Sequence, residues 1–177
     1  MTDDTALAER IRSAAADLDA LEPAVLAAGP WPLATRFDHS DEAAWGPREI
    51  LAHVDEMFPY WLGEAARILD AEPDAGPNAG PPAFGRVATD DVRSAILGRD
   101  RTLPLPELFD RARWEARRVV ALIDALAPAD LARRGLHPIR GEVSVAELLD
   151  RFVASHLAEH VAQLQAVLDG TGPGRPA

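Results

Sequence analysis

The chain alternates between stretches in which apolar residues recur every three or four positions and stretches rich in proline, glycine and polar residues. A spacing of three to four places apolar side chains on one face of an α-helix. The pattern predicts four long amphipathic helices, at about residues 5–27, 47–71, 106–127 and 145–168. Apart from a short extended piece around His137, no stretch has the alternation of a strand. We therefore expect an all-α fold, a four-helix bundle.

Local signals mark several helix ends. Pro47 suits the first position of the second helix, and Pro59 inside that helix predicts a kink. Ser144 and Glu147 have the spacing of a capping box at the start of the fourth helix. Gly170 supplies its C-terminal stop. The fourth helix thus has the clearest boundaries in the chain.

The connection between the second and third helices is long. Residues 72–88 are dense in proline and glycine, and a short helix is expected after Thr89, closed by Gly98. A crossover of this length lets the third helix run parallel to the second. We expect residues 1–170 to form one helical domain and residues 171–177 a flexible C-terminal tail.

The net charge of the chain and its lack of certain residue types exclude several classes of function. The 177 residues carry a net charge of −11, which argues against a nucleic-acid partner, since such proteins need a basic face. There is no cysteine and no lysine, so any thiol chemistry needs an exogenous thiol and Schiff-base chemistry is excluded. The polar, acidic start of the chain is unlike a signal peptide, and no apolar run approaches membrane-spanning length. We expect a cytoplasmic protein that acts on a small molecule and binds no membrane.

Two histidines lie at the centre of the apolar face of the fourth helix. His156 and His160 project within about 40° of each other on a regular helix, in the same sector as Val145 and Leu149. Buried imidazoles need partners, because an unpaired buried polar group costs roughly 1–3 kcal/mol. His53 lies on or beside the apolar stripe of the second helix. Three imidazoles from two helices would hold a divalent metal and leave a position open, which is the pattern of catalytic zinc.

The alternative is three satisfied core histidines, each bonded to a backbone carbonyl or a carboxylate. The segment from His156 to His160 also fits the H-x-x-E-H pattern of inverted zinc proteases. We do not favour that class, because it needs an acidic ligand downstream and only 17 residues follow His160.

Two further polar residues are candidates for proton handling. Glu159 projects about 60° from His156 and is either a proton shuttle or acceptor beside the site, or a solvated carboxylate. Gln163 lies in the histidine sector and either orients His160, bonds a water on the ion, or is a polar core residue. Trp61 is interpreted as packing, and His137 is assigned no role.

Three stretches carry a family resemblance. WGPREILAHV (45–54), GLHPIRGEVSVAELL (135–149) and SHLAEHVAQL (155–164) together resemble the DinB/YfiT-like superfamily. The resemblance implies an up-down-down-up four-helix bundle with a long crossover between the second and third helices, often homodimeric. It also implies a divalent metal, zinc or nickel, on His53, His156 and His160.

Characterised relatives in that superfamily include transferases and isomerases that use low-molecular-weight thiols such as bacillithiol or mycothiol. We therefore expect a metal-dependent transferase that activates an exogenous thiol, with Glu159 or Gln163 managing protons. A hydrolase that uses water on the same ion is the second hypothesis. A non-catalytic bundle that binds metal for stability or sensing is the third. Tris-imidazole sites accept several first-row ions, so the metal stays open.

Overall fold

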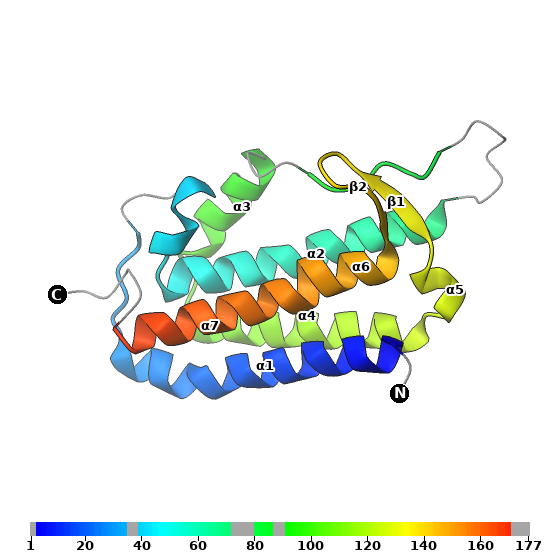
Figure 1. Cartoon of the computed structure of the whole chain (residues 1–177). Coiled ribbons are helices and arrows are strands. Elements are labelled where there is room, and N and C mark those ends of the chain that lie inside the picture. Colours follow the sequence, from blue (N-terminus) through cyan, green and yellow to red (C-terminus); the bar gives the residue numbers. More distant parts are fainter. Residues whose placement is uncertain (1–2, 35–38, 72–79, 87–90, 171–177) are drawn as a thin grey trace.

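Four long helical segments lie side by side in the computed structural model, which describes residues 3–34, 39–71, 80–86 and 91–170. They are α1 (Asp3–Ala28), α2 (Pro47–Asp70), α4 (Leu105–Ala125) and a composite last segment. That segment joins α6 (Val145–Leu149), η2 (Asp150–Ser155) and α7 (His156–Leu168). In Figure 1, α1 and the last segment run one way while α2 and α4 run the other. The predicted all-α, up-down-down-up bundle is confirmed.

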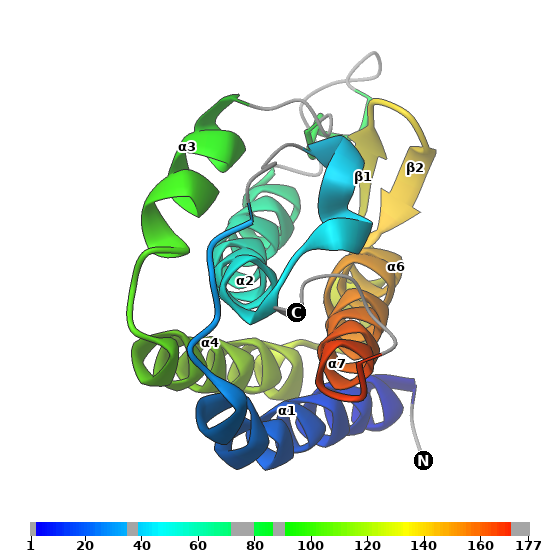
Figure 2. The same cartoon turned by 90° about the vertical axis from the view of Figure 1, so that its left-hand side faces the viewer.

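One apolar core fills the space between the four segments. Each contributes fully buried side chains at the spacing seen in the sequence, for example Ile11 on α1, Leu51 on α2, Phe109 on α4 and Leu164 on α7. Burying such a side chain contributes about 1.5–3 kcal/mol. Figure 2 shows α2 and α7 nearly end-on and beside each other. Among the described residues, none of the helices combines the length and the apolarity needed to cross a bilayer.

The crossover between α2 and α4 lies outside the bundle, as Figure 2 shows for its helix α3 (Asp91–Asp100). The short helix was predicted, but its expected end at Gly98 is wrong. Helical bonding continues past this residue, because the amide of Arg101 donates to the carbonyl oxygen of Leu97 at 3.0 Å. The predicted loop over residues 72–88 lies partly outside the described residues, and its described part pairs Ala83 in parallel with Leu136.

A small β-hairpin precedes the last segment. After the four-residue helix α5 (Pro128–Leu131), β1 (Arg134–His137) pairs antiparallel with β2 (Gly141–Ser144). The sequence predicted only an extended piece around His137, and the second strand was missed. Figure 1 shows this hairpin alongside α2 and α6.

The predicted ends of α2 and of the last segment are confirmed. Pro47 occupies the first turn of α2, which continues through Pro59 to Asp70. Ser144 Oγ accepts from the Glu147 amide at 3.1 Å, and the Glu147 carboxylate accepts from the Ser144 amide at 2.7 Å. Gly170 has a φ of 72°, the left-handed conformation of a helix stop. The expected tail at 171–177 lies outside the described residues.

The last segment is not a regular α-helix throughout. η2 is π-helical, so its backbone bonds from residue i to i+5 accommodate one extra residue. One residue corresponds to about 100° of rotation. The projection that placed Val145 and Leu149 in one sector with His156 assumed regular geometry and is wrong across 150–155. It holds within α7, from His156 to Gln163.

Candidate metal centre

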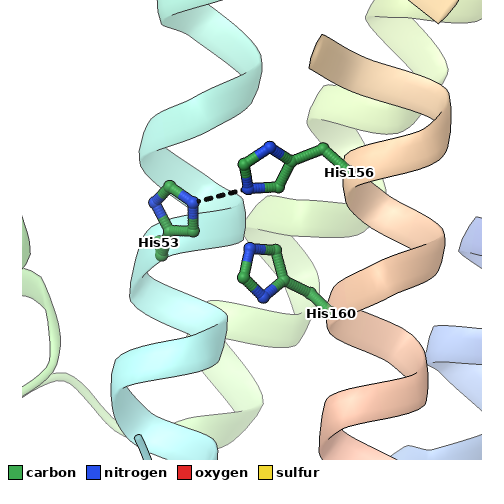
Figure 3. Close-up of side chains that lie close together, drawn as sticks. All are labelled: His53, His156 and His160. Atoms are coloured by element: carbon green, nitrogen blue, oxygen red, sulfur yellow. Dashed lines mark hydrogen bonds between the residues drawn. The ribbon is translucent and has the colours of Figure 1, made fainter. Parts of the chain in front are cut away.

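Three imidazoles meet where α2 faces α7 (Figure 3). His53 projects from α2, while His156 and His160 project from successive turns of α7. The ring centroid of His53 lies 5.1 Å from the centroid of His156 and 4.8 Å from that of His160. The centroids of His156 and His160 are 4.6 Å apart. One nitrogen from each ring can be chosen so that all three lie within 4.8 Å of one another. The structure therefore brings together the three histidines that the sequence selected.

His160 is oriented by Gln163, one turn further along α7. The Gln163 amide nitrogen donates to the backbone oxygen of Glu42 at 2.7 Å, so its oxygen faces Nδ1 of His160 at 3.0 Å. An amide oxygen only accepts, and Nδ1 of His160 must carry the proton. Nε2 of the same ring is then a lone-pair acceptor, and it is buried without a hydrogen-bond partner. Such an atom needs a ligand that the protein itself does not supply.

His53 has a different environment. Its Nδ1 lies 3.3 Å from Nη2 of Arg93, a buried arginine on α3 that also binds the carboxylate of Glu42 at 2.7 Å. Its Nε2 lies 3.0 Å from Nε2 of His156. Since guanidinium only donates, the proton of His53 lies on Nε2 and is shared with His156 in this arrangement.

Burial keeps all three rings in the neutral form. Desolvation lowers the pKa of His53 well below its ordinary value, and the neighbouring His160 and Arg93 lower it further. Desolvation also lowers the pKa of His160 to about 4, with His156 contributing. The pKa of His156 is lowered by the same cause, against the opposing charge of Glu42. Neutral imidazole is the form that binds metal ions.

The donor set fits a divalent ion. Nitrogen ligands of tetrahedral zinc lie about 3.3 Å apart, and the Nε2 atoms of His53 and His156 are 3.0 Å apart. The unpartnered Nε2 of His160 faces the same space. Binding would require the proton shared by His53 and His156 to move to Nδ1 of His53, so that all three ligands remain neutral imidazoles. Three protein nitrogens leave at least one position for a small molecule.

A cavity of about 640 Å³ adjoins the histidines and is lined by His53 and His156. Trp61 and Phe152 form one wall, with ring centroids 4.2 Å apart and planes 14° from parallel. Trp61 was interpreted as packing, and it both packs and lines this cavity. Of the two candidates for proton handling, the exposed Glu159 lines the cavity, whereas Gln163 bonds His160 and Glu42.

The sequence reasoning missed three residues of this region. His137 was assigned no role, yet it is 5% exposed, stacks on Phe152 with centroids 5.4 Å apart, and lines the cavity. Arg93 lies in the crossover and contacts His53. Glu42 lies in the segment before α2, and its backbone oxygen accepts a hydrogen bond from Gln163, the residue that orients His160. No periodic pattern in the sequence marks these two, because their positions depend on tertiary packing.

Comparisons with known proteins agree with the fold. The family model of the DinB superfamily matches residues 6–164. A search of curated proteins finds no match. Among solved structures, YfiT from Bacillus subtilis is similar, with a TM-score of 0.64 and 16% sequence identity over 94% of this chain and 87% of that chain. That protein is described as "a probable metal-dependent hydrolase with an unusual four-helix bundle topology".

Proposed function

The chain belongs to the DinB superfamily, and on that premise we propose that it is a divalent-metal-dependent enzyme whose ion is held by His53, His156 and His160. One observation carries the proposal. The buried Nε2 of His160 has no hydrogen-bond partner and lies beside two further neutral imidazoles at the edge of a cavity. A purely structural cluster would pair that atom, because leaving it unpaired costs roughly 1–3 kcal/mol.

The chemistry supplied by a bound dication follows from its ligands. With three neutral nitrogens it would keep its full charge and strongly lower the pKa of a thiol or water in its open position. Gln163 holds His160 so that Nε2 faces the other two imidazoles, where it would bind the ion. Glu159, exposed on the cavity wall, is the carboxylate placed to accept a proton and pass it to solvent.

The favoured reaction is transfer to an exogenous low-molecular-weight thiol. The chain has no cysteine, so the thiol has to come from a second small molecule. The cavity, at about 640 Å³, is within the range of small-molecule sites and leaves room for an electrophile beside a thiol. Zinc and nickel both suit the nitrogen donors.

Hydrolysis is the second candidate, and one comparison favours it. YfiT, whose structure is similar, is described as a probable metal-dependent hydrolase. Water would then take the place of the thiol, and the same histidines and Glu159 would serve.

Metal analysis of the purified protein tests the site. We expect about one equivalent of zinc or nickel in the wild type and loss of the ion in His53→Ala and His156→Ala. His137→Ala is the matched control, because it removes an imidazole from the same cavity outside the cluster. Unchanged metal content in the first two variants would overturn the proposal.

Turnover then separates the two reactions. A chromogenic electrophile such as 1-chloro-2,4-dinitrobenzene should react only when a thiol is supplied if the enzyme is a transferase. Hydrolysis of p-nitrophenyl acetate without thiol, lost in His156→Ala, would instead establish the hydrolase.

A further inference from the structure

The cavity beside the histidines is lined by residues of α2 and of the last segment, together with residues of α3 and of the β-hairpin. Phe152 precedes His156 by four residues along the last segment, and Trp61 follows His53 along α2. Because α2 and α7 run in opposite directions, both aromatic residues lie on the same side of the histidine cluster. Their stacking at 4.2 Å agrees with this placement.

Three nearly parallel aromatic rings line one side of the cavity. Phe152 stacks on Trp61 and on His137, in each case with 14° between the ring planes. Trp61 and His137 are buried, whereas Phe152 is partly exposed. An aromatic lining of this kind favours a planar, conjugated ligand, because contacts between aromatic rings contribute beyond their burial.

Arginines give the cavity a positive charge. Four line it: Arg86, Arg93, Arg140 and Arg151. The first is paired with Glu56 at 2.6 Å and the second with Glu42 at 2.7 Å. The structure gives the other two no ion pair with any carboxylate of the described residues. The charge of Arg151 contributes to lowering the pKa of Glu147, but no ion pair within the described part of the chain holds either guanidinium.

The acidic residues of the lining do not cancel this charge. Asp150 is already paired with Arg10. Only Glu159 remains, and it lies on α7 beside the histidines. In a chain of net charge −11, arginines without a carboxylate partner are unexpected in a cavity, since the chain holds 29 acidic residues for 18 arginines.

Arg140 is held against the aromatic wall. It lies in the turn of the β1–β2 hairpin, with its guanidinium carbon 5.6 Å from the centre of the Phe152 ring. The guanidinium of Arg140, the aromatic rings and two of the three histidines therefore line the same cavity. A guanidinium binds a carboxylate with two parallel hydrogen bonds, which gives both affinity and orientation.

We propose that this cavity binds an aromatic or conjugated carboxylate, with its acid group at Arg140 and Arg151, its planar body against Phe152 and its opposite end at the histidine cluster. This names the substrate class and rests on the proposed function. The two arginines position the substrate and take no part in the bond changes.

Two pairs of probes test the proposal by calorimetry. On zinc-loaded protein, 4-(mercaptomethyl)benzoate is compared with its neutral amide, which has the same shape and the same thiol. We expect the acid to bind about 10-fold more tightly, the effect of a hydrogen-bonded charge. In Arg140→Gln/Arg151→Gln the preference should disappear, while affinity for the amide and metal content stay unchanged.

The control variant is Arg12→Gln/Arg117→Gln, which removes two charges from the α1–α4 face. It should keep the preference for the acid. Equal binding of acid and amide by the wild type, or a preference that survives in Arg140→Gln/Arg151→Gln, would overturn the proposal.

The second pair, 4-methylbenzoate and 4-methylbenzamide, has no thiol and is titrated into metal-free protein. The acid should again bind more tightly in the wild type and lose that preference in Arg140→Gln/Arg151→Gln. Should the histidines hold no metal, the proposed function fails while this result stands. Should metal bind without any preference for the acid, only the carboxylate site fails.

Discussion

The guanidinium of Arg93 lies 3.3 Å from Nδ1 of His53, and this contact decides which nitrogen of the ring carries the proton. Arginine has no acceptor, so Nδ1 accepts and Nε2 is protonated. Nε2 is the atom that faces His156. For His53 to bind a metal through Nε2 as a neutral ligand, this proton has to move to Nδ1, where it would meet the guanidinium. Arg93 therefore opposes metal binding, both by its charge and by its hydrogen bond.

Replacing Arg93 should tighten the metal site. In Arg93→Gln the amide oxygen can accept a proton from Nδ1, and the positive charge beside the ion is gone. We expect zinc affinity to rise about 10-fold, the lower end of the effects known for residues that bond metal ligands. Competition with a chromogenic zinc indicator measures it. Arg99→Gln, on the exposed side of α3, should leave affinity unchanged. An Arg93→Gln protein with equal or weaker affinity would contradict this account.

Removing the support of His160 should weaken the site. Gln163→Leu deletes the acceptor for Nδ1 and frees the ring to turn or change tautomer. Zinc affinity should fall by about 10- to 100-fold with the fold intact by circular dichroism. Gln165→Leu is the matched control, since that side chain is exposed and bonds only Asp169 among the described residues. Equal losses in both variants would mean that helix stability, and not ring orientation, is responsible.

Gly85 should be needed for the position of His137. It has a φ of 85°, and a Cβ there would come within 2.6 Å of the His137 ring. Gly141 has a φ of 74° with no neighbour within 4 Å of such a Cβ. Both alanine variants incur backbone strain of about 1–2 kcal/mol, and only Gly85→Ala adds the clash. Urea unfolding should show the larger loss for Gly85→Ala; similar losses would mean that the ring simply moves aside.

Glu115 makes stability depend on pH. Burial raises the pKa of this carboxyl, against the opposing effect of Arg118. The folded state therefore disfavours the charged form, so stability is highest when the group is protonated. It falls as pH rises through the unfolded value near 4.5 towards the higher folded value. Glu115→Gln removes the cost, and its Tm should exceed the wild-type Tm by about 2 °C at pH 8. The difference should vanish near pH 4, and a constant difference would assign the effect to packing.

Local signals explain how much of this fold could be read in advance. The capping box of Ser144 and Glu147 and the stop at Gly170 act within a few residues, so they are visible in the sequence and confirmed in the structure. The four-residue spacing of His156 and His160 likewise fixes their shared direction on any α-helix. Pairing them with His53 needed the bundle as well, since only the packing of α2 on α7 brings that ring close.

What could not be predicted depends on distant contacts. Arg93 lies 40 positions from His53, in a crossover whose path the apolar pattern does not determine. His137 lies in a strand of four residues, too short for an alternation to stand out. Gly98 was expected to end α3, but a glycine can keep helical dihedrals, and here the helix continues to Asp100.

The π-helical turn η2 determines how many residues separate the start of the last segment from the histidines of this chain. Twelve positions separate Ser144 from His156 in this chain, and one of them is the additional residue that the i to i+5 bonds absorb. A relative whose last helix is regular has to reach the same imidazole direction with eleven. Deleting one residue between 150 and 155 would therefore leave a well-formed helix that points both rings elsewhere. An alignment gap in that turn is thus a change of geometry and not a neutral loss of length.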